Sequence, residues 1–90
     1  MTGRGRQTYD SGERFYGVWR NGLKHGPGKL VLPNKDYYEG TWYNDILEGE
    51  GRFVGLRQYY EGQFFDGKFH GYGISVARNG VRYQGSFFAG

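Results

Sequence analysis

Two histidines and a glutamate at equivalent spacing are the residues of this 90-residue chain best suited to chemistry. His25, Glu48 and His70 stand 23 and 22 residues apart, and side chains of these types can hold a metal ion such as zinc. The regular spacing argues against such a site. If each period is a two-stranded unit, four strands at about 4.8 Å per strand separate the histidines by roughly 19 Å, too far for one ion. We therefore expect no metal and no other cofactor.

Other catalytic arrangements each lack a necessary part. The serines have no base in phase with them, and the absence of cysteine excludes a thiol nucleophile, a disulfide and a thiolate zinc site. Glu48 and Glu50 share one side of a predicted strand, but without a pocket they do not make a glycosidase pair. No helix is predicted after the glycines of residues 3–5 or 26–28, so a phosphate cradle is not expected. We expect a protein that is not an enzyme.

The elements that would position these residues follow a glycine ladder whose steps are 23, 22 and 23 residues. An aromatic residue stands two positions before and two positions after each ladder glycine, and paired glycines recur nine and eleven residues later. Self-similarity at such a period is typical of a stacked array of repeats. The ladder glycines are Gly17, Gly40, Gly62 and Gly85, and the paired glycines are Gly26 and Gly28, Gly49 and Gly51, and Gly71 and Gly73.

Each repeat has the pattern of a β-hairpin. In the first strand of the second repeat, alternation places Tyr38, Gly40 and Trp42 on one face. Asn21-Gly22 in the first repeat and Asp66-Gly67 in the third follow the corresponding strand, and such pairs favour a type I′ turn. Second strands are predicted from 25 to 32, 48 to 54 and 70 to 77.

The connector between residues 51 and 60 is one residue shorter than its siblings and lacks an Asn-Gly pair, so we expect an irregular turn there. The paired glycines are predicted to be flat seats for aromatic rings from neighbouring strands. A valine at Gly49 is then expected to overpack against a ring, at a cost of about 1–3 kcal/mol.

This pattern resembles the MORN repeat (membrane occupation and recognition nexus), whose unit is roughly Tyr-x-Gly-x-Trp-x-x-Gly-x-x-x-Gly-x-Gly. The unit appears here at residues 38–42 with Gly49 and Gly51, and again at residues 60–73. Asp45 departs from it by replacing the turn glycine. The resemblance implies an all-β fold, a single-layer antiparallel β-meander of stacked hairpins that is elongated and twisted.

The resemblance covers essentially the whole chain as a single MORN-repeat domain, 1–90. It divides into a half repeat 1–14, repeats 15–37, 38–59 and 60–82, and a half repeat 83–90. Such a chain is a fragment of a longer array or one of the short proteins built almost only of these repeats, and the opening residues 1–5 favour the second interpretation. The uncharged strand 83–88 would be an open edge. We expect it to be covered by a further repeat, a second copy or a partner's strand.

Related arrays occur in cytoskeletal and ciliary scaffolds, at junctions between membranes and beside catalytic domains. The resemblance therefore implies a non-enzymatic protein-binding scaffold or adaptor in the cytoplasm, associated with cytoskeleton or cilium. An aromatic sheet face would supply the anchors, because Tyr and Trp are enriched at binding hot spots; the alternative is that the rings only cover glycines. The candidate partner-binding residues are Phe15, Trp19, Tyr38, Trp42, Tyr60, Phe64, Tyr83 and Phe87.

The second hypothesis is a peripheral membrane module that binds anionic phospholipid headgroups. Each Lys or Arg near such a surface contributes roughly 1 kcal/mol, but interspersed acidic residues offset much of this. The net charge is only +3 and no run of like charge exceeds Arg4 and Arg6, so nucleic acid is not an expected partner. No apolar run is long enough to span a bilayer, and the N-terminus lacks the apolar core of a signal peptide. We expect a soluble intracellular protein. The candidate lipid-binding residues are Arg14, Arg20, Lys24, Lys29, Arg52, Lys68, Arg78 and Arg82.

Overall fold

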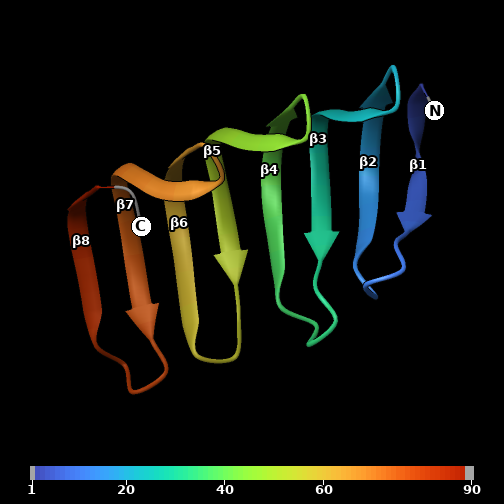
Figure 1. Ribbon diagram of the computed structural model, residues 1–90. Helices are drawn as coiled ribbons and strands as arrows, with labels where there is room; N and C mark the ends of the chain where they lie inside the picture. Colours follow the sequence, from blue (N-terminus) through green and yellow to red (C-terminus); the bar gives the residue numbers. More distant parts are fainter. Residues whose placement is uncertain (1, 89–90) are drawn as a thin grey trace.

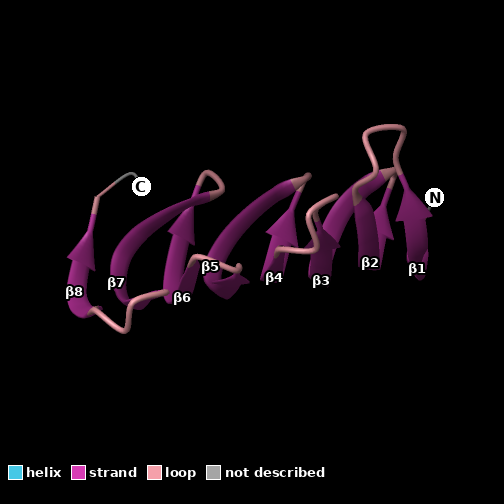
Figure 2. Ribbon diagram, turned by 90° about the horizontal axis from the view of Figure 1, so that it is seen from below, coloured by secondary structure: helices cyan, strands magenta, loops and turns pink. Residues whose placement is uncertain are grey.

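A computed structural model describes residues 2–88, which form one antiparallel β-sheet without helices (Figures 1 and 2). The eight strands lie side by side in chain order, and the sheet is a strip about 40 Å long. The predicted all-β meander is therefore confirmed. No helix that could cross a membrane occurs in this part of the chain. The strands are β1 (Gly3–Thr8), β2 (Arg14–Arg20), β3 (Leu23–Val31), β4 (Tyr37–Tyr43), β5 (Ile46–Val54), β6 (Gln58–Phe65), β7 (Lys68–Ala77) and β8 (Arg82–Phe87).

Two-residue turns close the hairpins β2–β3, β4–β5 and β6–β7. Both central residues of each turn have positive φ, for example 54° at Asn21 and 80° at Gly22, as a type I′ turn requires. Asp45 adopts a φ of 73° without being glycine. Its carboxylate accepts a hydrogen bond of 2.7 Å from the backbone N–H of Lys24, and its own N–H donates to the Lys24 carbonyl at 2.9 Å. These bonds tie the second hairpin to the first.

The connectors at the other ends of the strands differ as predicted. In three of them a backbone N–H donates to the carbonyl four residues later, as from Leu32 to Asp36 at 2.8 Å. Between β5 and β6 the corresponding bond runs from Gly55 to Gln58, only three residues later, at 2.9 Å. The shorter connector therefore closes with a different turn.

A continuous row of glycines crosses all eight strands. Each glycine of the row lies directly opposite the next one across every strand pair. Because none of them carries a side chain, large rings can lie directly on the backbone along this line. The row consists of Gly5, Gly17, Gly28, Gly40, Gly51, Gly62, Gly73 and Gly85.

Aromatic rings cover this row on one side of the sheet, which we call the ring face. Ring atoms of Phe15 occupy the place where a Cβ on Gly28 would stand. A Cβ on Gly73 would lie 2.6 Å from ring carbons of Tyr60, closer than real Cβ atoms approach their neighbours. At these positions the missing side chain makes room for a ring from another strand.

The buried core is a single layer of side chains on the ring face. Tyr60 stacks on Phe69 at 3.9 Å between ring centroids and meets Phe64 edge-on at 5.3 Å. The polar atoms of these rings are satisfied by backbone carbonyls: Tyr60 Oη donates to Gln63 at 2.7 Å, and Trp42 Nε1 donates to Gly28 at 3.0 Å. No second layer is present among residues 2–88, so the rings cover one another. The buried side chains are Phe15, Trp19, Trp42, Leu47, Tyr60 and Phe64.

Gly26, Gly49 and Gly71 do not have the predicted role of ring seats. Each has positive φ, between 75° and 97°, and each is the middle one of three residues that face a single residue across the hairpin. No atom lies within 4 Å of a Cβ built on Gly49. The expected overpacking against a ring is therefore not met at Gly49. A β-bulge with a left-handed backbone, rather than a ring, requires glycine there.

We expect Gly73→Ala to lower the free energy of unfolding by about 1–3 kcal/mol, because the added methyl group overlaps the ring of Tyr60. Urea denaturation followed by tryptophan fluorescence measures this change. Ser86→Ala on the exposed face of β8 is the control and should change stability by no more than about 0.5 kcal/mol. Equal urea midpoints for the two variants would show that the ring does not rest on Gly73.

At Gly49 the cost of substitution should depend on backbone conformation instead of volume. Asparagine tolerates positive φ, whereas a β-branched residue does not. Gly49→Asn should therefore keep a free energy of unfolding close to that of the wild type, whereas Gly49→Val should lower it by about 1–3 kcal/mol. Urea denaturation followed by tryptophan fluorescence measures both changes. An equally large loss in both variants would indicate a steric contact and contradict the bulge.

Candidate functional site on the outer face

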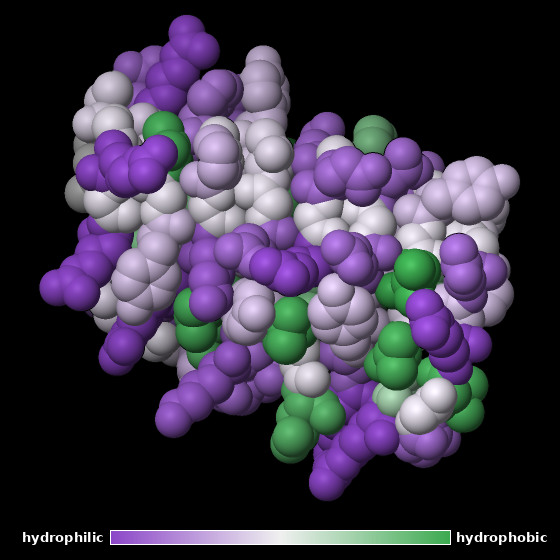
Figure 3. All heavy atoms as spheres, turned by 180° about the vertical axis from the view of Figure 1, so that it is seen from behind, coloured by the Kyte–Doolittle hydropathy of each residue, from purple (hydrophilic) through white to green (hydrophobic). Residues whose placement is uncertain are grey.

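The side of the sheet opposite the ring face, which we call the outer face, carries most of the exposed functional groups. Residues directly opposite each other on neighbouring strands share a face. The pairs Arg6–Tyr16, Tyr16–Lys29 and Lys29–Glu39 therefore place these four side chains in one line across β1–β4. In the view of Figure 3, hydrophilic side chains project from the sheet among small groups of hydrophobic atoms.

Most of the aromatic residues predicted to bind a partner are instead part of the core. Tyr38 and Phe87 are partly buried, and only Tyr83, at 51% exposure on the edge strand β8, is open to solvent. The expectation of an exposed aromatic face does not hold for the other five, because a single-layer sheet must use these rings to cover its own backbone. The five buried rings are Phe15, Trp19, Trp42, Tyr60 and Phe64, each at most 5% exposed.

Three exposed aromatic rings of the outer face come one residue after a ring of the ring face in the sequence. Tyr43, Phe65 and Phe88 each directly follow a ring of the ring face and are 59%, 60% and 88% exposed. The ring of His70 lies between the last two, 5.4 Å from Phe65 and 5.7 Å from Phe88. We call Tyr43, Phe65, His70 and Phe88 the outer aromatic row. Its signal in the sequence is an aromatic doublet at residues 42–43, 64–65 and 87–88, since alternation sends the second ring to the opposite face. The first repeat has Trp19-Arg20 at the equivalent place and contributes no ring to the row.

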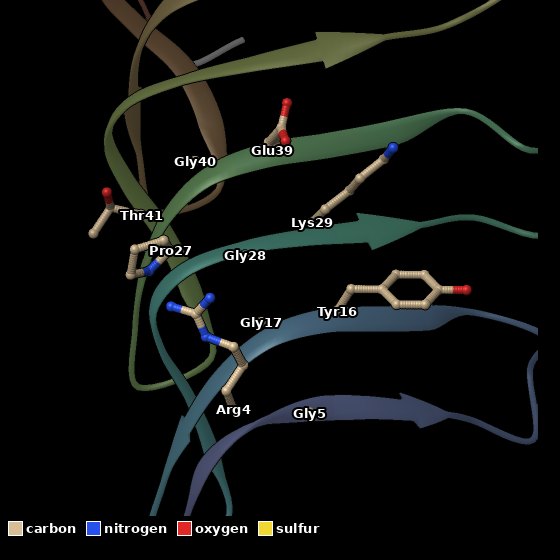
Figure 4. Close-up of a pocket in the computed structure, with 10 residues that line it drawn as sticks. All are labelled: Arg4, Gly5, Tyr16, Gly17, Pro27, Gly28, Lys29, Glu39, Gly40 and Thr41. Atoms are coloured by element: carbon tan, nitrogen blue, oxygen red, sulfur yellow. The ribbon is translucent and has the colours of Figure 1, made fainter.

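A shallow depression lies on the outer face over β1–β4 (Figure 4). Four members of the glycine row, on four neighbouring strands, form its floor. In Figure 4 the labelled side chains stand on either side of these glycines, with Arg4 and Thr41 on one side and Tyr16 and Lys29 on the other. A smaller depression adjoins it at Tyr16 and is lined by Arg6 and Arg14. The larger depression is lined by Arg4, Gly5, Tyr16, Gly17, Pro27, Gly28, Lys29, Glu39, Gly40 and Thr41.

Basic residues are concentrated in the N-terminal half of the sheet, whereas the C-terminal half carries both signs of charge. Strands β1–β3 contain six Lys and Arg residues and no Asp or Glu, whereas β4–β8 contain three basic and four acidic residues. On the outer face, Arg4, Arg6, Arg14 and Lys29 surround the two depressions, and we call them the basic cluster. None of them lies within 4.0 Å of a carboxylate in residues 2–88, where ion pairs form only at Lys24 and Arg52. This division is visible by strand and not by repeat, because each repeat combines strands from its own hairpin with acidic residues in the connectors.

The predicted lipid-binding residues do not form one patch. Lys24 lies on the ring face, with Nζ 3.7 Å from Asp45 Oδ1. Arg52 pairs with Glu39 at 2.8 Å, and this hydrogen bond is the main reason that the pKa of Arg52 is raised. Only Arg14 and Lys29 of the predicted set line the depressions, where they join two arginines of β1 that were not in the set.

The described residues do not bring together a metal-binding cluster. No three His, Asp or Glu side chains in residues 2–88 gather closely enough to hold a metal ion. His25 on β3 and His70 on β7 are four strands apart, and each lies beside an aromatic ring. Burial raises the pKa of Tyr38 and Tyr60 above the ordinary 10.0, so both phenols stay protonated at neutral pH. The absence of a metal and of enzymatic activity stays a prediction.

Comparison with known proteins gives the same repeat. A family model described as MORN repeat matches residues 15–37, 38–55 and 60–82. Alsin from Homo sapiens and Alsin from Mus musculus are both 35% identical to the chain over 78 residues, which cover 80% of it. The chain spans only 5% of the length of these relatives. Because the repeat model matches well over half of the residues, the chain belongs to the MORN repeat family and is a repeat-based binding module.

Proposed function

We propose that this chain is a non-enzymatic protein-binding module whose partner lies on the outer face against the outer aromatic row. The observation that carries this proposal is the exposure of three rings, Tyr43, Phe65 and Phe88, at equivalent positions of successive repeats. The core does not need these rings, because the ring face is already filled. Exposed aromatic side chains in a regular arrangement are typical anchors of a protein interface.

The geometry of the sheet suits a partner that runs across the strands. Tyr43 and Phe65 are on β4 and β6, two strands apart, and Phe88 follows β8, two strands further on. Two strands correspond to about 9.6 Å at the usual strand spacing. The two-residue turns and the hydrogen-bonded ladder hold this spacing, so little conformational entropy is lost on binding. A partner with apolar side chains at intervals of about 10 Å would meet Tyr43, Phe65 and Phe88 in turn.

The wider role that we propose is that of a cytoplasmic scaffold or adaptor associated with cytoskeleton or cilium. Its support is the resemblance to repeat arrays of such scaffolds. The edge strand β8 offers a second contact, since Tyr83 is exposed and residues 83–88 carry no charge. A strand from a partner or from a second copy could add to this edge by β-augmentation.

The double variant Tyr43→Ser/Phe65→Ser tests the proposal. Immobilised on beads in a cell extract, it should capture less than about one tenth of the partner protein that the wild type retains, because two anchors of about 1–2 kcal/mol each are lost. Quantitative mass spectrometry of the eluates measures this ratio. Both changes lie on exposed positions, and a far-UV spectrum checks that the sheet is intact.

Leu56→Ser is the matched control. Leu56 is 73% exposed but lies in the connector at the opposite ends of the strands. This variant should retain the same proteins in the same amounts as the wild type. If the double variant also retains them in full, the outer aromatic row is not the contact surface.

A further inference from the structure

We propose that the basic cluster binds an acidic peptide segment of a protein partner, seated in the depression over β1–β4. This inference rests on the proposed function, since it assigns the chemistry of one part of the partner. It concerns different residues, however: the basic cluster lies on β1–β3, whereas the outer aromatic row lies on β4, β6, β7 and the residue after β8.

The four cations of the basic cluster form no ion pair with a carboxylate of residues 2–88. Arg4, Arg6 and Arg14 are exposed, and no carboxylate of residues 2–88 lies within ion-pair distance of them. Lys29 is held with Nζ 4.0 Å from the centre of the Tyr37 ring, a contact that leaves its charge unpaired. Arginine is the residue best suited to carboxylates, because its planar guanidinium can donate two parallel hydrogen bonds to one of them. Four unpaired cations side by side therefore favour a partner with several carboxylates.

The shape of the depression favours a peptide chain. Its floor consists of glycines on four neighbouring strands, so it extends over three strand spacings, about 14 Å. An extended chain rises about 3.3 Å per residue, and about four residues would lie along such a floor. Side chains at these four positions would point to the ring face, so strand alternation leaves the outer face open there and a peptide backbone can approach the sheet. The hydroxyl groups of Tyr16 and Thr41 stand on opposite sides and can donate hydrogen bonds to its carboxylates.

The arrangement of charge beyond the depression favours an acidic peptide over a membrane. Glu39 marks the end of the basic area, and its carboxylate is paired with Arg52 at 2.8 Å. Further along the outer face stand Glu50 and Glu61, both exposed. A flat anionic membrane laid on this face would meet these carboxylates as well as the arginines, whereas a short peptide can keep its acidic residues over β1–β3.

Fluorescence anisotropy with a labelled peptide of eight glutamates tests this inference on the full 90-residue chain. At low salt the wild type should bind the peptide, and affinity should fall steeply as salt is added. The variant Arg4→Glu/Arg14→Glu/Lys29→Glu should raise the Kd at least about tenfold, because three attractive contacts become repulsive. The control Lys68→Glu/Arg78→Glu/Arg82→Glu changes the net charge equally on the other half of the sheet. It should raise the Kd no more than about threefold.

Two outcomes would overturn the inference. Equal weakening in both triple variants would show that only net charge matters. Binding of the wild type to phosphatidylserine vesicles in a sedimentation assay, without binding to the peptide, would assign the cluster to lipid headgroups instead. The variant Tyr43→Ser/Phe65→Ser should keep full affinity for the peptide, so failure of the outer aromatic row and failure of the basic cluster give different results.

Discussion

The packing of aromatic rings onto bare glycine backbone is the interaction on which this small sheet depends. A single-layer sheet has no helix or second sheet to cover its apolar side, and 90 residues allow little buried surface. The row from Gly5 to Gly85 solves this problem, because rings can lie flat on the backbone where no Cβ intervenes. Phe15 over Gly28 and Tyr60 over Gly73 are the same contact in different repeats.

Because of this constraint, the ring face serves to stabilise the fold, and the outer face is left available for binding. The ring face is filled by its own side chains, and little of Trp19 or Tyr60 is left for a partner to touch. The outer face is under no such demand, so it can carry exposed rings at one set of repeat positions and unpaired cations at another. The glycine row makes room for rings on the ring face. The same stretch of backbone, seen from the other side between the outward side chains, forms the floor of the depression.

Much of the fold could be predicted because it follows from local pattern. The glycine period, the alternation of residues and the turn pairs are all visible in the sequence, and the structure has the predicted hairpins. The β-bulge at Gly49 could not be found in this way, because it depends on which residues lie opposite across the hairpin, and that register emerges only when the strands pair. From the sequence alone, Gly49 and Gly51 are both predicted to lie under an aromatic ring. In the structure a Cβ on Gly51 would contact the ring of Phe64, whereas a Cβ on Gly49 would have no atom within 4 Å.

The candidate site was harder to predict for a different physical reason. Repetition identified the rings at Trp42 and Phe64 correctly as special, but it did not show that a sheet without a second layer must bury them. The neighbouring Tyr43 and Phe65 follow from strand alternation once the buried face is known. The basic cluster depends on residues from three strands, so it appears only when the charges are counted across the sheet. Arg4 and Arg14 are ten residues apart in the sequence but belong to adjacent strands.

Hydroxyl-radical footprinting of the 90-residue chain tests most directly whether one set of rings builds the sheet and the other set is open to partners. The oxidation rate of each aromatic side chain, read by mass spectrometry, reports its exposure to solvent. Tyr43 and Phe65 should oxidise rapidly, whereas Trp19 and Tyr60 should be strongly protected until the chain is unfolded by urea. Oxidation of Trp19 and Tyr60 in the folded chain as fast as that of Tyr43 and Phe65 would contradict this division of the two faces.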